Sequence, residues 1–319
     1  MKITILDGYG LNPGDLSWEG FEKWGEVTVF DRTSPDELLE RAKDSEVLIT
    51  NKTVLDANTL SLLPKLKYIG VLATGYNVVD IEEAKKRNIT VTNIPAYSTM
   101  SVAQHVFALL LAVTDRVEHY ALQVRDGKWS RSKDFCYWDT PLEELAGKTF
   151  GIIGYGNIGK KVASIALAFG LRVIVFTSKP ESELEKGVRK VSMNDLLKES
   201  DIVSLHCPLN KDTEYLINGR TLDLMKTGSI LINTGRGGLI DEKAVAGALR
   251  SGKLKAFCAD VLSSEPPATD NPLLQAPNTY ITPHVAWATK EARERLMDIA
   301  GSNLSSWILG TPINTVTGS

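Results

Sequence analysis

The sequence predicts an α/β protein made of two doubly wound domains with parallel sheets. Short apolar runs alternate with helix-like stretches along all 319 residues, which is the pattern of repeated strand and helix units. The chain is also longer than one typical domain. A glycine-rich turn, residues 154–159, lies between an apolar run and a helix-like stretch in the second half. We therefore expect a small first domain and a larger second one.

The first hundred residues carry the elements of the smaller domain. Its expected strands lie near residues 2–6, 46–50, 67–72 and 90–93. Its expected helices lie near residues 17–24, 35–43 and 79–87. Because strands and helices alternate, we expect a parallel sheet with helices on both faces.

The middle of the chain predicts a helix followed by an arm. Residues 101–113 are almost entirely apolar and begin with a serine, so they predict a buried helix that bridges the two domains. Residues 125–141 are aromatic, charged and without periodicity, so we expect an arm or loop and not a core element.

The remaining residues predict the larger domain and a final helix. The expected strands lie near residues 149–153, 172–177, 202–206, 229–233, 256–261 and 279–282. Residues 289–309 space Ala292, Leu296, Ile299 and Ala300 on one face, and Thr289 is able to cap the start. This pattern predicts an amphipathic helix.

Composition narrows the class of function. The 36 basic and 39 acidic residues give a net charge of -3, which offers no electrostatic case for binding nucleic acid or an anionic membrane. The three cysteines, Cys136, Cys207 and Cys258, lack metal or redox spacing, so we expect reduced thiols, no metal centre and a cytoplasmic location. We see no signal peptide and no transmembrane run. A small-molecule ligand is the better expectation.

The turn Gly154-Tyr155-Gly156-Asn157-Ile158-Gly159 has the spacing of a dinucleotide-binding fingerprint. Gly154 permits the tight turn, Gly156 lets the backbone approach a pyrophosphate, and Gly159 lets the following helix pack on the strand. The amino terminus of that helix attracts phosphates. A purely structural glycine turn is the alternative.

The strand after this fingerprint bears on the choice between NAD and NADP. NAD-specific sites place an acidic residue at its end, where it binds the adenosine ribose. This chain has Thr177, Ser178 and Lys179 there, all compatible with a phosphate. We therefore expect NADP to be accepted. The alternatives are that only NAD is used and that Lys179 is a solvated loop residue.

Three charged residues follow expected buried strands: Arg236, Glu265 and His284. Open parallel sheets bind ligands at the carboxyl ends of their strands. There, an arginine would clamp an anion, an imidazole would move a proton and a carboxylate would tune the imidazole. Taken singly, these residues also fit a salt bridge, a solvated acid and a buried histidine.

Several motifs in order resemble those of the D-isomer-specific 2-hydroxyacid dehydrogenases. They are the glycine fingerprint, His206-Cys-Pro-Leu209 with Thr213, Asn233-Thr-Gly-Arg-Gly237, Ala259-Asp260 through Glu265-Pro266, and Pro283-His284. Ser101-Val-Ala-Gln104 and Asp134-Phe-Cys-Tyr-Trp138 are similar to the branch of glycerate dehydrogenase, also called hydroxypyruvate reductase. Gln104, where the family usually has glutamate, and Trp287, where it has a small residue, depart from the pattern.

The resemblance implies how the domains are divided. Residues 1–99 and 287–319 would form a flavodoxin-like substrate domain, and a Rossmann domain for NAD or NADP, residues 100–286, would be inserted into it. The segment of about 100–145 would hold a homodimer together. A closing motion of the domains over the cleft is then expected, because water must leave before hydride transfer.

The resemblance also implies residue roles. Arg236 would bind the substrate carboxylate and keto oxygen, His284 would exchange a proton with the substrate, and Glu265 would hold the imidazole. Amides at Thr74 and Gly75 would receive the substrate carboxylate, and Trp138 would border the partner's substrate pocket or only contact the dimer partner. The cofactor would contact Cys207, Pro208, Thr213, Thr234, Arg236 and, through its carboxamide, Asp260, for which a capping or turn role is the alternative.

The implied activity is reduction of a small 2-oxo acid, such as hydroxypyruvate or glyoxylate, to the D-2-hydroxy acid with NADH or NADPH. Two alternatives remain open. One is an enzyme of the phosphoglycerate dehydrogenase branch, and the other is a dinucleotide-sensing scaffold that resembles the C-terminal-binding corepressors.

Overall fold

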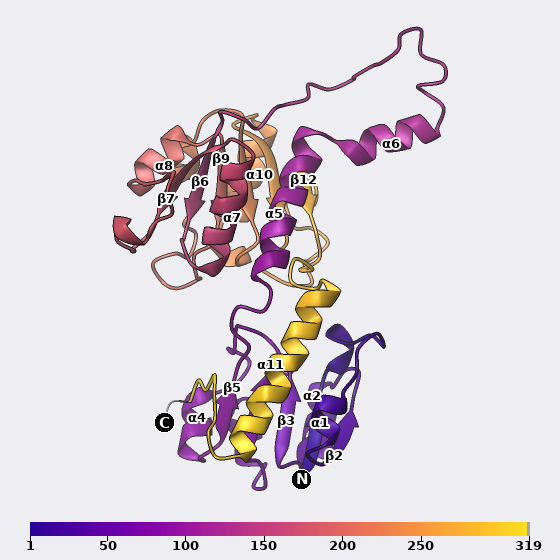
Figure 1. The fold of residues 1–319 in the computed structure, drawn as a ribbon, viewed down its shortest axis with the longest axis vertical. Helices are drawn as coiled ribbons and strands as arrows, with labels where there is room; N and C mark the ends of the chain where they lie inside the picture. Colours follow the sequence, from indigo (N-terminus) through magenta and orange to yellow (C-terminus); the bar gives the residue numbers. More distant parts are fainter. Residues whose placement is uncertain (318–319) are drawn as a thin grey trace. The chain divides into compact units, whose positions relative to one another are not determined.

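The computed structural model describes residues 1–317, which divide into two compact units. Unit 1 consists of Met1–Ser98 and the chain from Ala288 onward, and unit 2 consists of Thr99–Trp287. Residues 318 and 319, which the expected first domain included, lie outside the described residues. Figure 1 shows the elements of both units.

Unit 1 is built on a five-stranded sheet in which every ladder is parallel. Its strands are β1 (Lys2–Ile5), β2 (Glu26–Val29), β3 (Val47–Thr50), β4 (Tyr68–Val71) and β5 (Thr90–Thr92). They lie in the order β2-β1-β3-β4-β5, which is the order of flavodoxin-like sheets. The expected flavodoxin-like fold is therefore confirmed.

Helices cover this sheet, and the last of them comes from the end of the chain. They are η1 (Gly8–Gly10), α1 (Glu19–Glu22), α2 (Pro35–Ala42), α3 (Ala57–Ser61), α4 (Ile81–Lys86) and α11 (Lys290–Ile308). The Thr289 side chain accepts from the backbone N–H of Ala292, as expected of its cap. Helix α11 contacts β4, where the rings of Tyr68 and Trp307 lie 5.0 Å apart. The terminal helix thus completes a core that begins with β1.

Unit 2 contains a seven-stranded sheet, again with parallel ladders throughout. Its strands are β6 (Thr149–Ile153), β7 (Arg172–Phe176), β8 (Val188–Lys190), β9 (Ile202–Leu205), β10 (Ser229–Asn233), β11 (Leu254–Ala259) and β12 (Thr279–Ile281). The order β12-β11-β10-β9-β6-β7-β8 is that of a Rossmann sheet with one added strand. The order reverses between β6 and β9, and such reversal points are where open sheets bind ligands.

Two buried clusters cover the two faces of this sheet. One includes Phe107 of α5 and Val162 of α7, and the other includes Leu196 of α8, Leu222 of α9 and Val245 of α10. The helices of unit 2 are α5 (Thr99–Thr114), α6 (Val117–Arg125), α7 (Asn157–Ala168), η2 (Glu181–Glu183), α8 (Met193–Glu199), α9 (Gly219–Leu224), η3 (Gly237–Leu239) and α10 (Glu242–Arg250). The sheet is doubly wound, as expected.

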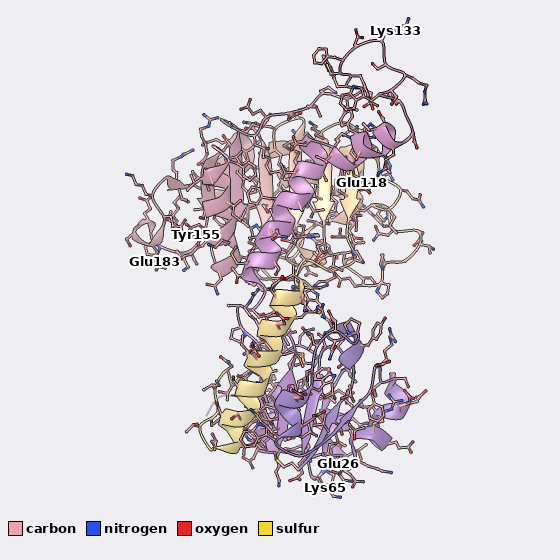
Figure 2. All side chains as sticks on the ribbon, turned by 45° about the vertical axis from the view of Figure 1, so that its right-hand side comes forward. Glu26, Lys65, Glu118, Lys133, Tyr155 and Glu183 are labelled. Carbon is pink, nitrogen blue, oxygen red and sulfur yellow. The ribbon has the colours of Figure 1, made fainter. Side chains whose placement is uncertain are left out.

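An arm leaves unit 2 after α6 and returns to the start of β6. Figure 1 shows it standing away from the sheet, and Figure 2 shows Lys133 near its tip. No single helix among residues 1–317 is long and apolar enough to cross a membrane. Helices α5 and α6 have the length and apolar composition of a membrane span only as a pair, and the chain bends by 57° between them.

The expected elements missed two of the four edge strands, β2 and β8. Their burial explains why: both are short, and neither contains a fully buried residue. An edge strand that faces solvent lacks the apolar run by which central strands are found. The buried helix α5 also begins at Thr99, two residues before the expected Ser101.

Arg293 ties α11 to the chain that follows β1. Its guanidinium donates to both carboxylate oxygens of Asp15, at 2.7 and 2.6 Å, and to the carbonyl oxygen of Leu11. The hydrogen bond from Arg293 holds the pKa of the Asp15 carboxyl below its ordinary value. The ion pair therefore stabilises the fold only while Asp15 is ionised.

We expect Asp15→Asn to lower the melting temperature of unit 1 at pH 7, on the order of 1 °C, because the exposed carboxylate is partly screened by solvent. A lowered carboxyl pKa contributes stability that is present above the unfolded-state value and lost as pH falls through the folded-state value. The difference between the two proteins should therefore shrink below about pH 4. Calorimetry across pH measures this.

Asp44→Asn is the comparison, because Asp44 forms a single, more exposed ion pair with Lys65 at 2.6 Å. Its effect should be smaller. A larger effect for Asp44→Asn, or an Asp15 effect that does not change with pH, would contradict the assignment.

Candidate active site

The strands β10, β11 and β12 are adjacent and end at one level. Asn233 pairs with Ala259, and Ala259 pairs with Ile281, so the last residues of the three strands lie side by side. The turns that follow them carry Arg236, Glu265 and His284. The sheet register thus delivers all three expected catalytic residues to one edge of unit 2.

His284 and Glu265 are joined directly. The Nδ1 atom of His284 lies 2.6 Å from Oε2 of Glu265, and Oε1 of Glu265 accepts from the backbone N–H of Leu262 at 3.2 Å. A carboxylate only accepts, so the hydrogen lies on Nδ1 and the other ring nitrogen, Nε2, is left to exchange a proton. The His284 side chain is 30% exposed, which leaves it accessible to a ligand.

Arg236 stands at the start of the turn after β10. Its Nη1 donates to the carbonyl oxygen of Gly235 at 2.8 Å, and within residues 1–317 its guanidinium has no acidic partner. The turn is held by the buried side chain of Asn233, which donates to the Arg236 carbonyl at 2.9 Å and accepts from the Gly235 N–H at 3.0 Å. An exposed guanidinium on a fixed turn is suited to an anionic ligand.

The turns after β10 and β11 pack against each other through their backbones. A Cβ atom placed on Gly237 would overlap the carbonyl group of Leu262. Only glycine permits this approach, which keeps the turn that carries Arg236 against the turn that leads to Glu265. A side chain here would separate them.

Asp260 follows β11 and is almost completely buried, at 1% exposure. Its carboxylate accepts from the Thr282 hydroxyl and from two backbone N–H groups, of Val285 and Ala286. The side chain is thus engaged by the turn after β12, in line with the turn role that the sequence left open. Its contact with a nicotinamide carboxamide stays a prediction.

The glycine fingerprint lies between β6 and α7, beside the point where the strand order reverses. Gly154 has a φ of +95°, and a Cβ there would collide with the backbone of His206 and Cys207. A Cβ on Gly159 would overlap the Gly154 carbonyl oxygen, whereas Gly156 has open space around it. The first and third glycines therefore serve the fold, and the second leaves room for a ligand.

The other fingerprint residues surround the start of α7. Tyr155 is buried, and its hydroxyl accepts from the Glu185 N–H at 3.4 Å. Burial raises the pKa of Tyr155. In the part of the chain that the structure describes, the N–H groups of Asn157 and Ile158 have no acceptor, and the first turn of α7 carries no acid. This helix end can receive an anion.

The strand end after β7 is already engaged in part. Lys179 forms an ion pair with Glu183 at 3.1 Å, and its N–H donates to the Thr177 hydroxyl at 3.2 Å. Ser178 is exposed. Figure 2 shows Tyr155 and Glu183 on the same side of unit 2. The cation expected to meet a 2′-phosphate therefore has a neighbouring acid.

The remaining expected cofactor residues differ in whether their side chains already have hydrogen-bond partners. Thr213 closes a turn, because its hydroxyl donates to the Pro208 carbonyl and accepts from the Asn210 N–H. Cys207 is half-buried, which raises the pKa of its thiol. The hydroxyl oxygen of Thr234 is buried and has no partner in the described chain. An unpaired buried hydroxyl marks a place where a ligand atom would fit.

His206 follows β9 and is not one of the three expected catalytic residues. Its Nε2 lies 2.8 Å from the Ser204 hydroxyl, and loss of hydration lowers the pKa of His206 to about 4. The imidazole is therefore neutral at neutral pH, which fits its expected place at a strand end.

Thr74 and Gly75 lie in unit 1, in the turn after β4. The Thr74 carbonyl accepts from the Asn93 side chain, and the Thr74 hydroxyl donates to the Ile94 carbonyl, both at 2.8 Å. Across the described residues, the backbone N–H groups of Thr74 and Gly75 have no acceptor. The turn is fixed while two donors stay available.

Trp138 lies on the arm, with 69% of its surface exposed. Phe135, on the same arm, is 89% exposed. Both aromatic side chains of the arm are thus largely open to solvent. Trp287, the last residue of unit 2, is half-buried.

Sequence reasoning missed the residues that hold the site in place. Glu242 accepts from the Ser263 N–H and from the Asn271 side chain, both at 2.8 Å, and so fixes the loop that contains Glu265. His105 contacts Thr282 across 177 positions. No local sequence pattern predicts contacts between residues so far apart in the chain. Residues 1–317 contain no group of three or more His, Cys, Asp or Glu side chains able to hold a metal ion.

Comparisons with known proteins agree with this geometry. Residues 107–286 match the model of the family described as D-isomer specific 2-hydroxyacid dehydrogenase, NAD binding domain. The chain is 48% identical to a hydroxypyruvate reductase of Blautia hydrogenotrophica, over 99% of both chains. It is 43% identical to a glycerate dehydrogenase of Methylorubrum extorquens, over 99% of this chain and 98% of the other.

Among solved structures, the chain is similar to an acyclic imino acid reductase in complex with NADPH and D-Arg. The TM-score is 0.85 and the identity is 34%, over 99% of this chain and 100% of that one. The similarity extends over both units.

The glycines permit a test of the fingerprint. We expect Gly156→Ala to fold normally, because a Cβ there meets no atom, but to weaken NADH binding about tenfold, equivalent to about 1.4 kcal/mol, because the methyl group would stand where the fingerprint predicts the pyrophosphate. Gly159→Ala should instead destabilise the protein by about 1–3 kcal/mol, through overpacking. Thermal unfolding and NADH fluorescence titration separate the two effects. A Gly156→Ala protein that binds NADH normally would remove this turn from the cofactor site.

Proposed function

The chain belongs to the D-isomer-specific 2-hydroxyacid dehydrogenase family, and we propose that its substrates are small 2-oxo acids, hydroxypyruvate and glyoxylate. It is an oxidoreductase that uses NAD(P) to interconvert 2-oxo and 2-hydroxy acids. The products would be D-glycerate and glycolate. Similarity to a hydroxypyruvate reductase and a glycerate dehydrogenase over nearly their whole lengths supports this choice.

The observation that carries the proposal is the arrangement at the strand ends of unit 2. Three adjacent strands that end at one level are followed by an imidazole hydrogen-bonded to a carboxylate and by a guanidinium that has no acidic partner among residues 1–317. Reduction of a ketone needs these two functions, a proton donor and a clamp for negative charge.

We assign the substrate anion to Arg236, and the family resemblance implies a second contact for the carboxylate at Thr74 and Gly75. Arg236 would bind the carboxylate and the keto oxygen through two N–H groups and stabilise the charge that develops on that oxygen. The free amides of Thr74 and Gly75 would receive the carboxylate. Both features are held by neighbouring side chains before any ligand binds.

His284 would supply the proton. A bound nicotinamide would supply the hydride that reduces the keto carbon. Nε2 of His284 then gives its proton to the resulting alkoxide, while Nδ1 stays bonded to Glu265. The carboxylate thereby orients the ring and stabilises the imidazolium before the transfer. In the oxidation direction, Nε2 takes the proton back.

The residues present fit a dinucleotide. The free N–H groups at the start of α7 and the open space at Gly156 would receive the pyrophosphate, and the unpaired Thr234 hydroxyl offers one further contact. Cys207, Pro208 and Thr213 would border the adenosine side by the family resemblance.

We propose that both NADH and NADPH are accepted. No acid follows β7 directly, and Ser178 and Lys179 would meet a 2′-phosphate. The imino acid reductase similar to this chain was solved with NADPH. Glu183 would weaken the attraction of Lys179 for a 2′-phosphate, because it already pairs with Lys179.

We also propose a homodimer, in which the arm of one chain lies against the other. A groove of about 480 Å³ is lined by apolar residues of α5 and α6, among them Leu111 and Leu122. The exposed Phe135 and Trp138 would bury apolar surface in such a dimer, and Trp138 would border the partner's pocket. Sedimentation as a monomer would contradict this.

A cytoplasmic location, tested by cell fractionation, stays a proposal.

Initial rates with hydroxypyruvate, glyoxylate and pyruvate, each against NADH and NADPH, test the proposed function. We expect the highest kcat/KM with hydroxypyruvate, a turnover of roughly 1–10³ s⁻¹, and measurable rates with both cofactors. The measurement is the loss of reduced cofactor at matched concentrations. No turnover with any pair would overturn the proposal and favour the dinucleotide-sensing scaffold.

Two variants test the residue roles. His284→Gln should lower kcat by about 10²–10⁴-fold, because it removes the proton donor, and should flatten the fall in reduction rate at high pH. Arg236→Lys should lower kcat/KM by about 10²–10³-fold, because lysine cannot form the bidentate contact. NADH affinity should stay unchanged in both.

The matched control is Arg250→Lys, which alters an arginine of α10 whose guanidinium contacts the Pro272 carbonyl. It should leave the kinetics unchanged. Loss of NADH affinity alone in Arg236→Lys, or a wild-type pH profile in His284→Gln, would refute the corresponding role.

A further inference from the structure

The turn that carries His284 is fixed from both sides by one buried carboxylate. Thr282 donates its hydroxyl to Oδ1 of Asp260 at 2.6 Å. The backbone N–H groups of Val285 and Ala286 donate to Oδ1 and Oδ2, each at 2.8 Å. His284 lies between these contacts in the sequence. Asp260 thus holds the residues before and after the imidazole.

The backbone of His284 needs such support. Its φ is +54°, in the left-handed region that residues with a Cβ rarely adopt, and its N–H donates to the Thr282 carbonyl at 3.0 Å. A conformation of this kind persists only where the surroundings impose it. The contacts of Asp260 on either side impose it here.

A third side chain, His105 of α5, extends the network. Its Nε2 lies 2.9 Å from the Thr282 hydroxyl oxygen and 3.7 Å from Oδ1 of Asp260. The Thr282 hydroxyl has one hydrogen, and its shortest contact directs that hydrogen to Asp260. His105 must therefore be the donor to Thr282, with a hydrogen on Nε2. Hydrogen bonds thus run in one direction, from His105 through Thr282 to Asp260.

We propose that Asp260, Thr282 and His105 are positioning residues that set the orientation of the His284 imidazole for proton transfer. This inference rests on the proposed role of His284. It assigns to Asp260 a task that needs no contact with a ligand, in agreement with its 1% exposure. It also assigns functions to Thr282 and His105, which the sequence left without one.

The two possible tasks of Asp260 have different consequences. If the carboxylate bound the carboxamide of the cofactor, its loss would weaken NADH binding. If it positions His284, its loss lowers kcat while NADH affinity is kept, because misplacing a reacting group by about 1 Å costs up to about 10²-fold in rate. Thr282 separates the tasks further, because its hydroxyl contacts Asp260, His105 and, at 3.4 Å, the Ala259 carbonyl oxygen, and no contact with the cofactor is expected of it.

The experiment compares Thr282→Val, Thr282→Ser and Asp260→Asn in the full-length protein. We expect Thr282→Val to lower kcat for hydroxypyruvate at least about tenfold, with KM and the Kd of NADH within about twofold of wild type. Thr282→Ser, which keeps the hydroxyl, should restore the rate. Asp260→Asn should lower kcat further, again without loss of NADH affinity.

Thr279→Val is the matched control. It makes the same change three residues earlier on β12, where the Thr279 hydroxyl donates to the Ala276 carbonyl and not to Asp260. We expect wild-type kinetics. An equal loss in Thr279→Val and Thr282→Val would show general damage to the strand and would overturn the proposal.

Imidazole NMR gives a readout that does not need turnover. The chain has four histidines, so the ring signals of His284 can be identified by comparison with His284→Gln. We expect these signals to shift or broaden in Thr282→Val and to recover in Thr282→Ser. If the wild-type protein reduces no 2-oxo acid, the proposed function fails, and these spectra still decide whether the network orients His284.

Two further results would overturn the positioning role. One is an unchanged kcat together with unchanged His284 signals in Thr282→Val. The other is a tenfold or greater rise in the NADH Kd of Asp260→Asn with kcat preserved at saturating NADH, which would assign Asp260 to the cofactor.

Discussion

The register between β10, β11 and β12 is the constraint on which the site depends. Along β11, Phe257 and Ala259 belong to one buried cluster, and Ala256 and Cys258 belong to the other. A slip of one residue would exchange these side chains between faces that are both fully packed. The end of the strand, and with it Asp260, is therefore fixed by the core. The chemistry at the sheet edge inherits this precision from residues that never meet a ligand.

The two carboxylates after β11 show how environment divides roles. Asp260 is buried and surrounded by donors, because a buried charge is tolerated only when it is hydrogen-bonded. Glu265, five residues on, keeps 38% of its side chain exposed and bonds a single imidazole. A group locked in place by three donors is suited to support. A group at the surface, paired with a titratable ring, is suited to take part in proton transfer.

The sequence predicted features that depend on local pattern. A few consecutive residues encode each central strand, the glycine fingerprint and each charged residue that follows a strand. The fold class and the family could therefore be predicted. Strands β2 and β8 could not, because their exposed residues lack an apolar run. Likewise, no spacing announces that His105 reaches Thr282, or that Glu242 fixes the loop of Glu265, since these contacts form only when distant elements pack. The pairing of Glu265 with His284 could be anticipated, because both residues follow buried parallel strands, whose carboxyl ends meet in one crevice.

The end of β7 illustrates how a local motif acquires its meaning from tertiary contacts. Read alone, Lys179 is a free cation that favours a 2′-phosphate. In the structure it pairs with Glu183, while Lys190 donates to its carbonyl oxygen at 2.6 Å. An ion pair between exposed side chains contributes at most about 1 kcal/mol, so a phosphate that carries nearly two charges competes effectively for the same ammonium. If both cofactors are accepted, as we propose, the neighbouring acid would lower the preference for the phosphorylated cofactor without closing the site to it. Exposed groups, and not the buried sheet, would then decide between the two cofactors.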